Sequence, residues 1–136
     1  MRTLLLTALL VTALPSFAQS SLMVDWEWKR AHQCSSTSPS IEVDDIPADA
    51  KSLTIALVDQ DAPDFDHGGG VVAHDGRQKV SIPEGALKSY RGPCPPNFDS
   101  FGHDYRFIVR AIAADGKTEL AQGEKTKTFS ANAVKP

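Results

Sequence analysis

Apolar and polar side chains alternate along much of the chain beyond its first twenty residues, and this period of two predicts β-strands. The clearest strand lies within 104–115, where Tyr105 and Phe107 stand two positions apart and point the same way. Residues 52–59 are almost continuously aliphatic or β-branched, which is typical of a strand buried on both faces. The expected strands cover, in chain order, 24–29, 41–43, 52–59, 71–72, 79–83, 104–115 and 123–130.

Helical signals are weak. Only the segment Pro-Glu-Gly-Ala-Leu-Lys-Ser-Tyr at 83–90 offers a proline suited to a first turn, so we expect one or two short helical turns there. Asp115 and Gly116 predict a hairpin turn. The pattern indicates an all-β fold with minor α content, and prolines at loop positions suit a two-sheet architecture. They lie at 39, 47, 63, 83, 93, 95 and 96.

The first eighteen residues have the pattern of a secretory signal peptide. Arg2 gives a positive start, and Ser16-Phe17-Ala18 is a small-x-small cleavage signal. The apolar run at 4–14 is shorter than the roughly 20 residues that span a bilayer, although a retained membrane anchor is the alternative reading. We expect cleavage after Ala18, a periplasmic or secreted product, and a single domain at 19–136 whose last residues, 131–136, fray.

The net charge indicates which partners are disfavoured, and the two cysteines indicate a disulfide. The formal net charge of −3 disfavours nucleic acid, which requires a basic surface, and no polybasic cluster is present to hold anionic lipids. No second apolar stretch approaches membrane length, so we expect no transmembrane segment in the mature chain. The only two cysteines, Cys34 and Cys94, would meet an oxidising compartment after export, where we expect a disulfide. Two buried free thiols are the alternative, because sequence does not show proximity.

The stretch Asp-Ala-Pro-Asp-Phe-Asp-His-Gly-Gly-Gly at 61–70 places a histidine between carboxylates and bare backbone. A metal site is one interpretation, but Pro63 stands where a calcium loop needs an oxygen ligand. An esterase-type oxyanion hole is another, but no G-x-S-x-G nucleophile motif accompanies it. The candidate metal ligands are Asp59, Asp61, Asp64, Asp66 and His67.

An anion-binding pocket is the third and favoured interpretation of 61–70. Consecutive glycine N–H groups can surround an anion, and a histidine beside them can donate to it. His74 is a substitute for His67 in this role, because the glycines leave the register open. A solvent-exposed turn histidine followed by a flexible glycine hairpin remains the structural alternative.

Four ordered motifs between Leu22 and Phe129 together resemble the phosphatidylethanolamine-binding protein family, whose bacterial branch is often called Raf kinase inhibitor-like. They are Val-Asp-Gln-Asp-Ala-Pro at 58–63, a histidine shortly after it, Tyr-Arg-Gly-Pro-Cys-Pro-Pro at 90–96, and Gly-His-Asp-Tyr-Arg-Phe at 102–107. The resemblance implies a Greek-key β-sandwich of two antiparallel sheets with a small pocket for phosphate- or carboxylate-like anions and phospholipid head groups.

Carried over by position, the family's pocket residues become a set of nine candidates. The resemblance implies that two histidines and Tyr105 donate to the anion, while Asp61 orients His67 or receives an ammonium group. Gly68 stands where the family usually has an aromatic residue, and the chain leaves no room for a C-terminal helix beside the pocket, so we expect an open mouth without a stacking wall. The candidate ligand-binding residues are Asp59, Asp61, Pro63, His67, Tyr90, Gly92, Pro93, His103 and Tyr105.

The function that these residues favour is small-ligand binding, without catalysis, cofactor or resident metal. The ligand would be a small anion or a phospholipid head group. A protein-interaction or protease-inhibitor module with a partner in the cell envelope is the alternative. A hydrolase that uses His67 or His103 as general base is the third hypothesis.

Overall fold

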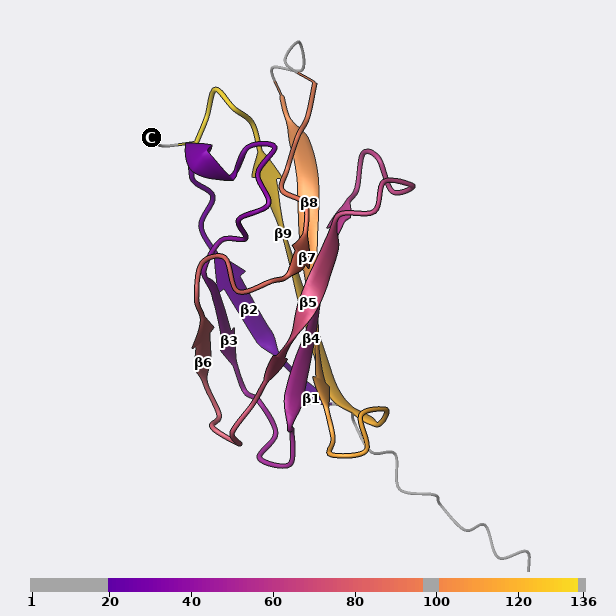
Figure 1. Cartoon of the computed structure of the whole chain (residues 1–136). Coiled ribbons are helices and arrows are strands. Elements are labelled where there is room, and N and C mark those ends of the chain that lie inside the picture. The colour runs from indigo at the N-terminus through magenta and orange to yellow at the C-terminus, as the bar shows by residue number, and fades with distance from the viewer. Residues whose placement is uncertain (1–19, 97–100, 135–136) are drawn as a thin grey trace, which may run out of the picture.

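The computed structural model describes residues 20–96 and 101–134, and these fold into two β-sheets that face each other (Figure 1). The larger sheet has the strand order β1-β9-β8-β4-β5-β7, and the smaller one has the order β2-β3-β6. All pairings are antiparallel except that of β1 with β9. The strands are β1 Ser20–Ser21, β2 Met23–Trp26, β3 Ile41–Asp44, β4 Ser52–Asp59, β5 Gly68–Ala73, β6 Val80–Ile82, β7 Ser89–Tyr90, β8 His103–Ile112 and β9 Glu119–Phe129.

The core lies between the sheets, as the alternating pattern predicted. Trp26 of β2 meets Phe107 of β8 edge to face, with ring centroids 4.9 Å apart, so the two sheets are in direct contact. Along β4, Leu53 is buried whereas Val58 and the other side chains of the opposite face remain partly exposed. The expectation that 52–59 is buried on both faces is therefore wrong, because the larger sheet has a second layer on one side only.

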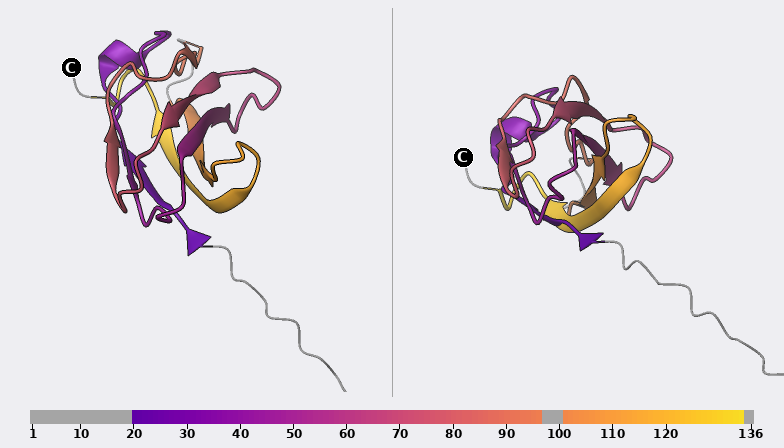
Figure 2. Two further views of the ribbon diagram at one scale, coloured as in Figure 1. Left: turned by 60° about the horizontal axis from the view of Figure 1, so that its bottom comes forward. Right: turned by 90° about the horizontal axis from the view of Figure 1, so that it is seen from below.

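The chain crosses between the sheets in the middle of the fold. It leaves β5 of the larger sheet, forms β6 in the smaller sheet, and returns through β7 to β8, which pairs with β4. Figure 2 shows the two layers from below, with the β8–β9 pair curving around one side of the core. This connection agrees with the predicted Greek-key sandwich, and the predicted turn at Asp115 and Gly116 joins β8 to β9.

The helix predicted at 83–90 is absent from this part of the described chain. Residues 83–86 form a tight turn in which the Ala86 N–H donates to the Pro83 carbonyl at 3.1 Å, and the chain then enters β7. Pairing of Tyr90 with Gly68 fixes this extended conformation, so a tertiary contact overrides the local helical preference. A 3₁₀ helix, η1 at Arg30–His32, forms instead between β2 and β3, in a segment to which no element was assigned from the sequence.

Predictions were made for both ends of the chain, a signal peptide at 1–18 and a frayed segment at 131–136. The expected signal peptide lies outside the described residues. At the other end, the Val134 N–H donates to the Ser130 carbonyl at 3.2 Å, and Val134 packs on the core. Residues 131–134 of the predicted frayed end therefore fold back on the domain. Within 20–96 and 101–134, no helix is long and apolar enough to cross a membrane.

Candidate functional site

Four strand ends meet at one end of the larger sheet, the upper end in Figure 1. β4 ends at Asp59, β5 begins at Gly68, β7 ends at Tyr90 and β8 begins at His103. Antiparallel pairing places Asp59 opposite Tyr105, so motifs more than forty residues apart become neighbours. Asp59, His67, His103 and Tyr105 form what we call the histidine–aspartate cluster.

Asp59 is the centre of this cluster. Alternation along β4 directs it toward the core, where it is 3% exposed. Its Oδ1 accepts the backbone N–H groups of Asp61 at 2.9 Å and Ala62 at 3.1 Å, and its Oδ2 accepts Nδ1–H of His103 at 2.8 Å. Burial raises the pKa of Asp59, but the hydrogen bonds from His103 and the Asp61 backbone outweigh it, so the pKa lies below the ordinary 3.8. The carboxylate is charged at neutral pH.

His67 is held from behind by the backbone of Arg91. Its Nδ1 lies 2.8 Å from the Arg91 carbonyl oxygen, and because a carbonyl only accepts, Nδ1 carries a proton. Its Nε2 then faces the cluster, 3.8 Å from Oδ2 of Asp59. The Arg91 N–H returns a bond to the His67 carbonyl at 2.8 Å. His67 is 3% exposed, so the solvent-exposed turn histidine of the structural alternative is excluded.

The tyrosines add two buried donors. The hydroxyls of Tyr90 and Tyr105 form no hydrogen bond in the part of the chain that the structure describes. Burial raises the pKa of both, and the Asp59 carboxylate raises that of Tyr105 further, so both hydroxyls keep their protons at neutral pH. A buried polar group without a partner is uncommon and indicates a place where a ligand or water completes the bonding.

The three glycines form a strand, and the flexible hairpin of the structural alternative is not observed. Gly68 has φ +63°, and a Cβ there would lie 1.8 Å from the Ser89 carbonyl oxygen of β7. Its N–H donates to Oδ1 of Asp66 at 2.8 Å, so it does not serve the predicted anion cradle. The glycines permit close strand pairing and so bring β7, with Tyr90, against β5.

The other predicted site residues occupy supporting positions. The Gly92 N–H donates to the Ser35 carbonyl at 2.7 Å, and the buried Pro93 accepts the Cys34 N–H at 2.8 Å. Asp61 is exposed and accepts the Asp104 N–H at 2.7 Å, whereas Pro63 is exposed in the 60–67 loop.

His74 is not part of the site. It follows the far end of β5, about 20 Å from His67 at the usual rise of a strand. There its Nε2 donates to the Arg77 carbonyl at 2.7 Å. Of the two histidines, His67 is therefore the one that lies beside Asp59.

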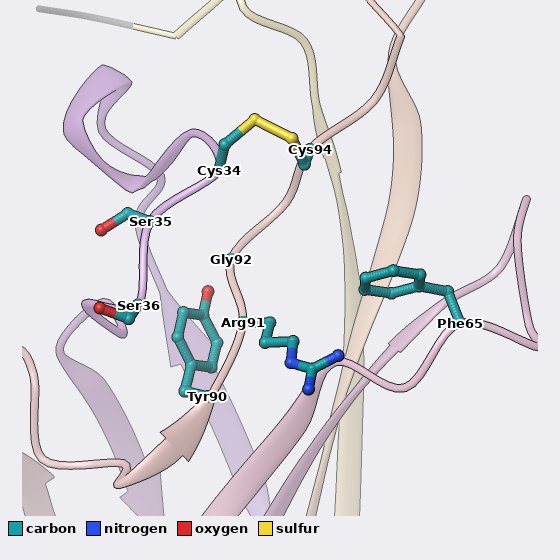
Figure 3. Close-up of a pocket in the computed structure, with 8 residues that line it drawn as sticks. All are labelled: Cys34, Ser35, Ser36, Phe65, Tyr90, Arg91, Gly92 and Cys94. Carbon is teal, nitrogen blue, oxygen red and sulfur yellow. A yellow bond between two sulfur atoms is a disulfide. The ribbon is translucent and has the colours of Figure 1, made fainter.

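A cavity of about 300 Å³ opens beside the cluster (Figure 3). Phe65 forms one side, and its ring centroid lies 4.6 Å from that of His67. The prediction that the pocket lacks an aromatic wall is therefore wrong, because an aromatic side chain before the histidine replaces the one missing at Gly68. The predicted Cys34–Cys94 disulfide is present and forms the opposite wall, and the described lining residues are Cys34, Ser35, Ser36, Phe65, Tyr90, Arg91, Gly92 and Cys94.

A cation is the other group that this end of the sheet could hold. Asp59, Asp61 and His103 each bring one ligand atom within 4.8 Å of the others, whereas Asp66 of the predicted metal set bonds to the Gly68 N–H. Two carboxylates and one imidazole suit a divalent ion. However, both carboxylates already accept hydrogen bonds from the protein, so an ion would have to displace them.

These features define a β-sandwich with a polar, largely buried cluster of side chains at the ends of four strands. The phosphatidylethanolamine-binding protein family model matches residues 14–135, and the chain belongs to that family. No curated protein matches the chain. Membership makes this a ligand-binding protein of the family's type.

Proposed function

We propose that this chain is an exported, non-catalytic binding protein for small phosphate- or carboxylate-like anions. The observation that carries the proposal is the buried Tyr105 side chain, whose hydroxyl lacks a hydrogen-bond partner among the described residues and whose ring packs against two histidines. Its ring centroid is 5.4 Å from that of His67 and 6.2 Å from that of His103. The phenol and the two imidazoles are three neighbouring polar groups that can donate to an oxyanion.

Asp59 orients these donors and offsets their charge. Its two oxygens are occupied by backbone N–H groups and by His103, so its negative charge is already directed into the protein. The Asp59 carboxylate holds His103 through Nδ1, so the Nε2 atom of that ring is directed away from Asp59. Asp59 therefore acts as a positioning residue, and the histidines and Tyr105 are the groups that contact the ligand.

Titration with inorganic phosphate tests the proposal. At a hundredfold excess over the dissociation constant, a bound anion should stabilise the fold by about 2.7 kcal/mol. His67→Gln and His103→Gln should each weaken phosphate affinity by about tenfold or more, since each removes a hydrogen bond to a charged group. The measurement is thermal unfolding against phosphate and acetate, with calcium as a separate arm.

The matched control for these variants is His74→Gln. It makes the same substitution in a buried histidine outside the site and should leave phosphate affinity within about twofold. If phosphate does not stabilise the wild-type protein, or if His74→Gln weakens affinity as much as His67→Gln does, the proposal fails. Stabilisation by calcium alone would assign the site to a cation.

The export part of the proposal rests on the signal-peptide pattern at 1–18 and is supported by the disulfide, which suits an oxidising compartment. We expect the full chain, expressed in a bacterium, to appear in the periplasm or medium with Gln19 as its first residue. Intact mass and N-terminal sequencing of each fraction measure this. Recovery from the cytosol with residues 1–18 attached would contradict it.

Hydrolysis is a second candidate, favoured by the Asp59–His103 hydrogen bond, because a carboxylate bound to Nδ1 orients a histidine as general base. A hydrolase would turn over phosphate or carboxylate esters, and the pH dependence of its rate would show the titration of a histidine. The His103→Gln variant would lose this activity. The binding proposal instead predicts that neither the wild-type protein nor His103→Gln hydrolyses these esters faster than buffer alone does.

A further inference from the structure

The cavity beside the histidine–aspartate cluster contains one charged side chain among its described lining residues, that of Arg91. The remaining lining is neutral: it consists of the disulfide, Phe65, Tyr90, Gly92 and the two serines Ser35 and Ser36. Figure 3 shows the Arg91 guanidinium extending toward the side on which Phe65 lies. A small, partly apolar cavity with a single cation favours a ligand that carries an anionic group.

Arg91 has no ion-pair partner in the described ranges. Three other arginines do: Arg77 pairs with Asp75 at 2.9 Å, and Arg106 and Arg110 pair with neighbouring acids at 3.3 Å. Two acids of the 60–67 loop accept backbone N–H groups, Asp66 from Gly68 and Asp61 from Asp104. The guanidinium is therefore available to a ligand.

The cavity and the histidine–aspartate cluster share a wall. The carbonyl of Arg91 accepts Nδ1–H of His67 at 2.8 Å, so the residue that supplies the cation also positions the histidine. Phe65 lines the cavity and packs on the His67 ring. His67 therefore lies between the cluster, which its Nε2 faces, and the Arg91 backbone, and a ligand that engages both the cluster and Arg91 has to extend past the Phe65 ring.

We propose that Arg91 forms a second anion subsite, so that the ligand is a small molecule with two acidic groups, such as a phosphonate or phosphate ester that also carries a carboxylate. This proposal rests on the proposed anion-binding function and specifies its ligand class. The first group binds at the histidine–aspartate cluster, and the second pairs with the guanidinium, whose planar fork matches a carboxylate. A ligand with an ammonium group in place of the carboxylate would place like charges together in the cavity.

Three probes of similar size test the second subsite: methylphosphonate, phosphonoacetate and 2-aminoethylphosphonate. Binding to the wild-type protein is measured by NMR titration of the backbone amides of the full mature chain. We expect phosphonoacetate to bind about three- to tenfold more tightly than methylphosphonate, as for a charge-assisted pair at a partly exposed site. We expect 2-aminoethylphosphonate to bind no more tightly than methylphosphonate.

The variant Arg91→Gln should reduce the ratio of phosphonoacetate to methylphosphonate affinity to about one. The charge control is Lys117→Gln, in the β8–β9 turn about 30 Å along β8 from the site, which should keep the wild-type ratio. Equal affinities for the two probes in the wild-type protein, or a preference that survives Arg91→Gln, would overturn the Arg91 subsite while leaving anion binding intact. If neither probe binds, the proposed function itself fails and the subsite fails with it.

Discussion

Replacing both Cys34 and Cys94 by serine is expected to lower the free energy of unfolding by about 4 kcal/mol. This value follows from the chain-entropy estimate for a bridge between residues 60 apart, because the bridge restricts the unfolded chain far more than the folded one. In the folded state the two segments are also joined by the Cys34 N–H, which donates to the Pro93 carbonyl, so the fold should survive the substitution. Urea unfolding at pH 7 of the oxidised wild-type protein and of the double variant measures the difference.

Reduction provides the matched control for the disulfide prediction. A thiol reductant should bring the wild-type protein to the stability of the double variant and should not change the variant itself. Ser36→Ala, in the same loop and on an exposed side chain, should change stability by less than about 0.5 kcal/mol. A loss below about 1 kcal/mol on removing the bridge would contradict the prediction and indicate that the backbone contacts alone hold the cavity wall.

The strands were predictable from the sequence because each packs one face on a single core. Val24 and Trp26 of β2, like Tyr105 and Phe107 of β8, alternate with polar neighbours, and all four are buried. The segment at 83–90 was not predictable in this way. Its conformation depends on the pairing of Tyr90 with Gly68, which is a contact between distant segments that no local preference encodes.

The glycine triplet shows why residue type alone assigned the wrong role. Glycine permits close approach of either a ligand or another backbone, and the sequence is the same in both cases. The structure places the Ser89 carbonyl where a Gly68 side chain would be, so the close partner is the neighbouring strand. The same ambiguity applies to Gly92, where a Cβ would lie 2.4 Å from the His32 carbonyl oxygen.

The part of the candidate site that lies on strands or at their ends was predictable from the sequence motifs. The part that is formed by loops was not. The family resemblance brought Asp59, His67, His103 and Tyr105 together, and the register of β4 with β8 explains how the two outer motifs meet. Phe65 and Arg91 were missed as cavity residues because their neighbours come from other segments. The available signal was the position of Arg91 inside the Tyr-Arg-Gly-Pro-Cys-Pro-Pro motif.

Substituting Asp59 is expected to have the largest effect of any single change within the site. Asp59→Ala should lower the free energy of unfolding by about 3 kcal/mol at pH 7, because it leaves two backbone N–H groups and His103 without their shared acceptor. Asp59→Asn retains one oxygen acceptor but not the charge, so about half of that loss is expected. Asp64→Asn, on an exposed side chain of the same loop, is the matched control and should be neutral.

The stability difference between the wild-type protein and Asp59→Asn should depend on pH in a defined direction. Folding lowers the pKa of the Asp59 carboxyl below 3.8, because the hydrogen bonds from His103 and the Asp61 backbone outweigh the opposing effect of burial. The charged carboxylate therefore contributes stability that is fully present above its unfolded-state pKa and is lost as pH falls through the lower folded-state value. Urea unfolding between pH 7 and pH 3 should show a difference that narrows as the pH approaches 3.8 from above and continues to narrow below it. A difference that stays constant to pH 3 would mean that folding does not lower the pKa of the Asp59 carboxyl, and one that widens in acid would mean that folding raises it; either result would contradict the stabilisation of the carboxylate by its hydrogen bonds.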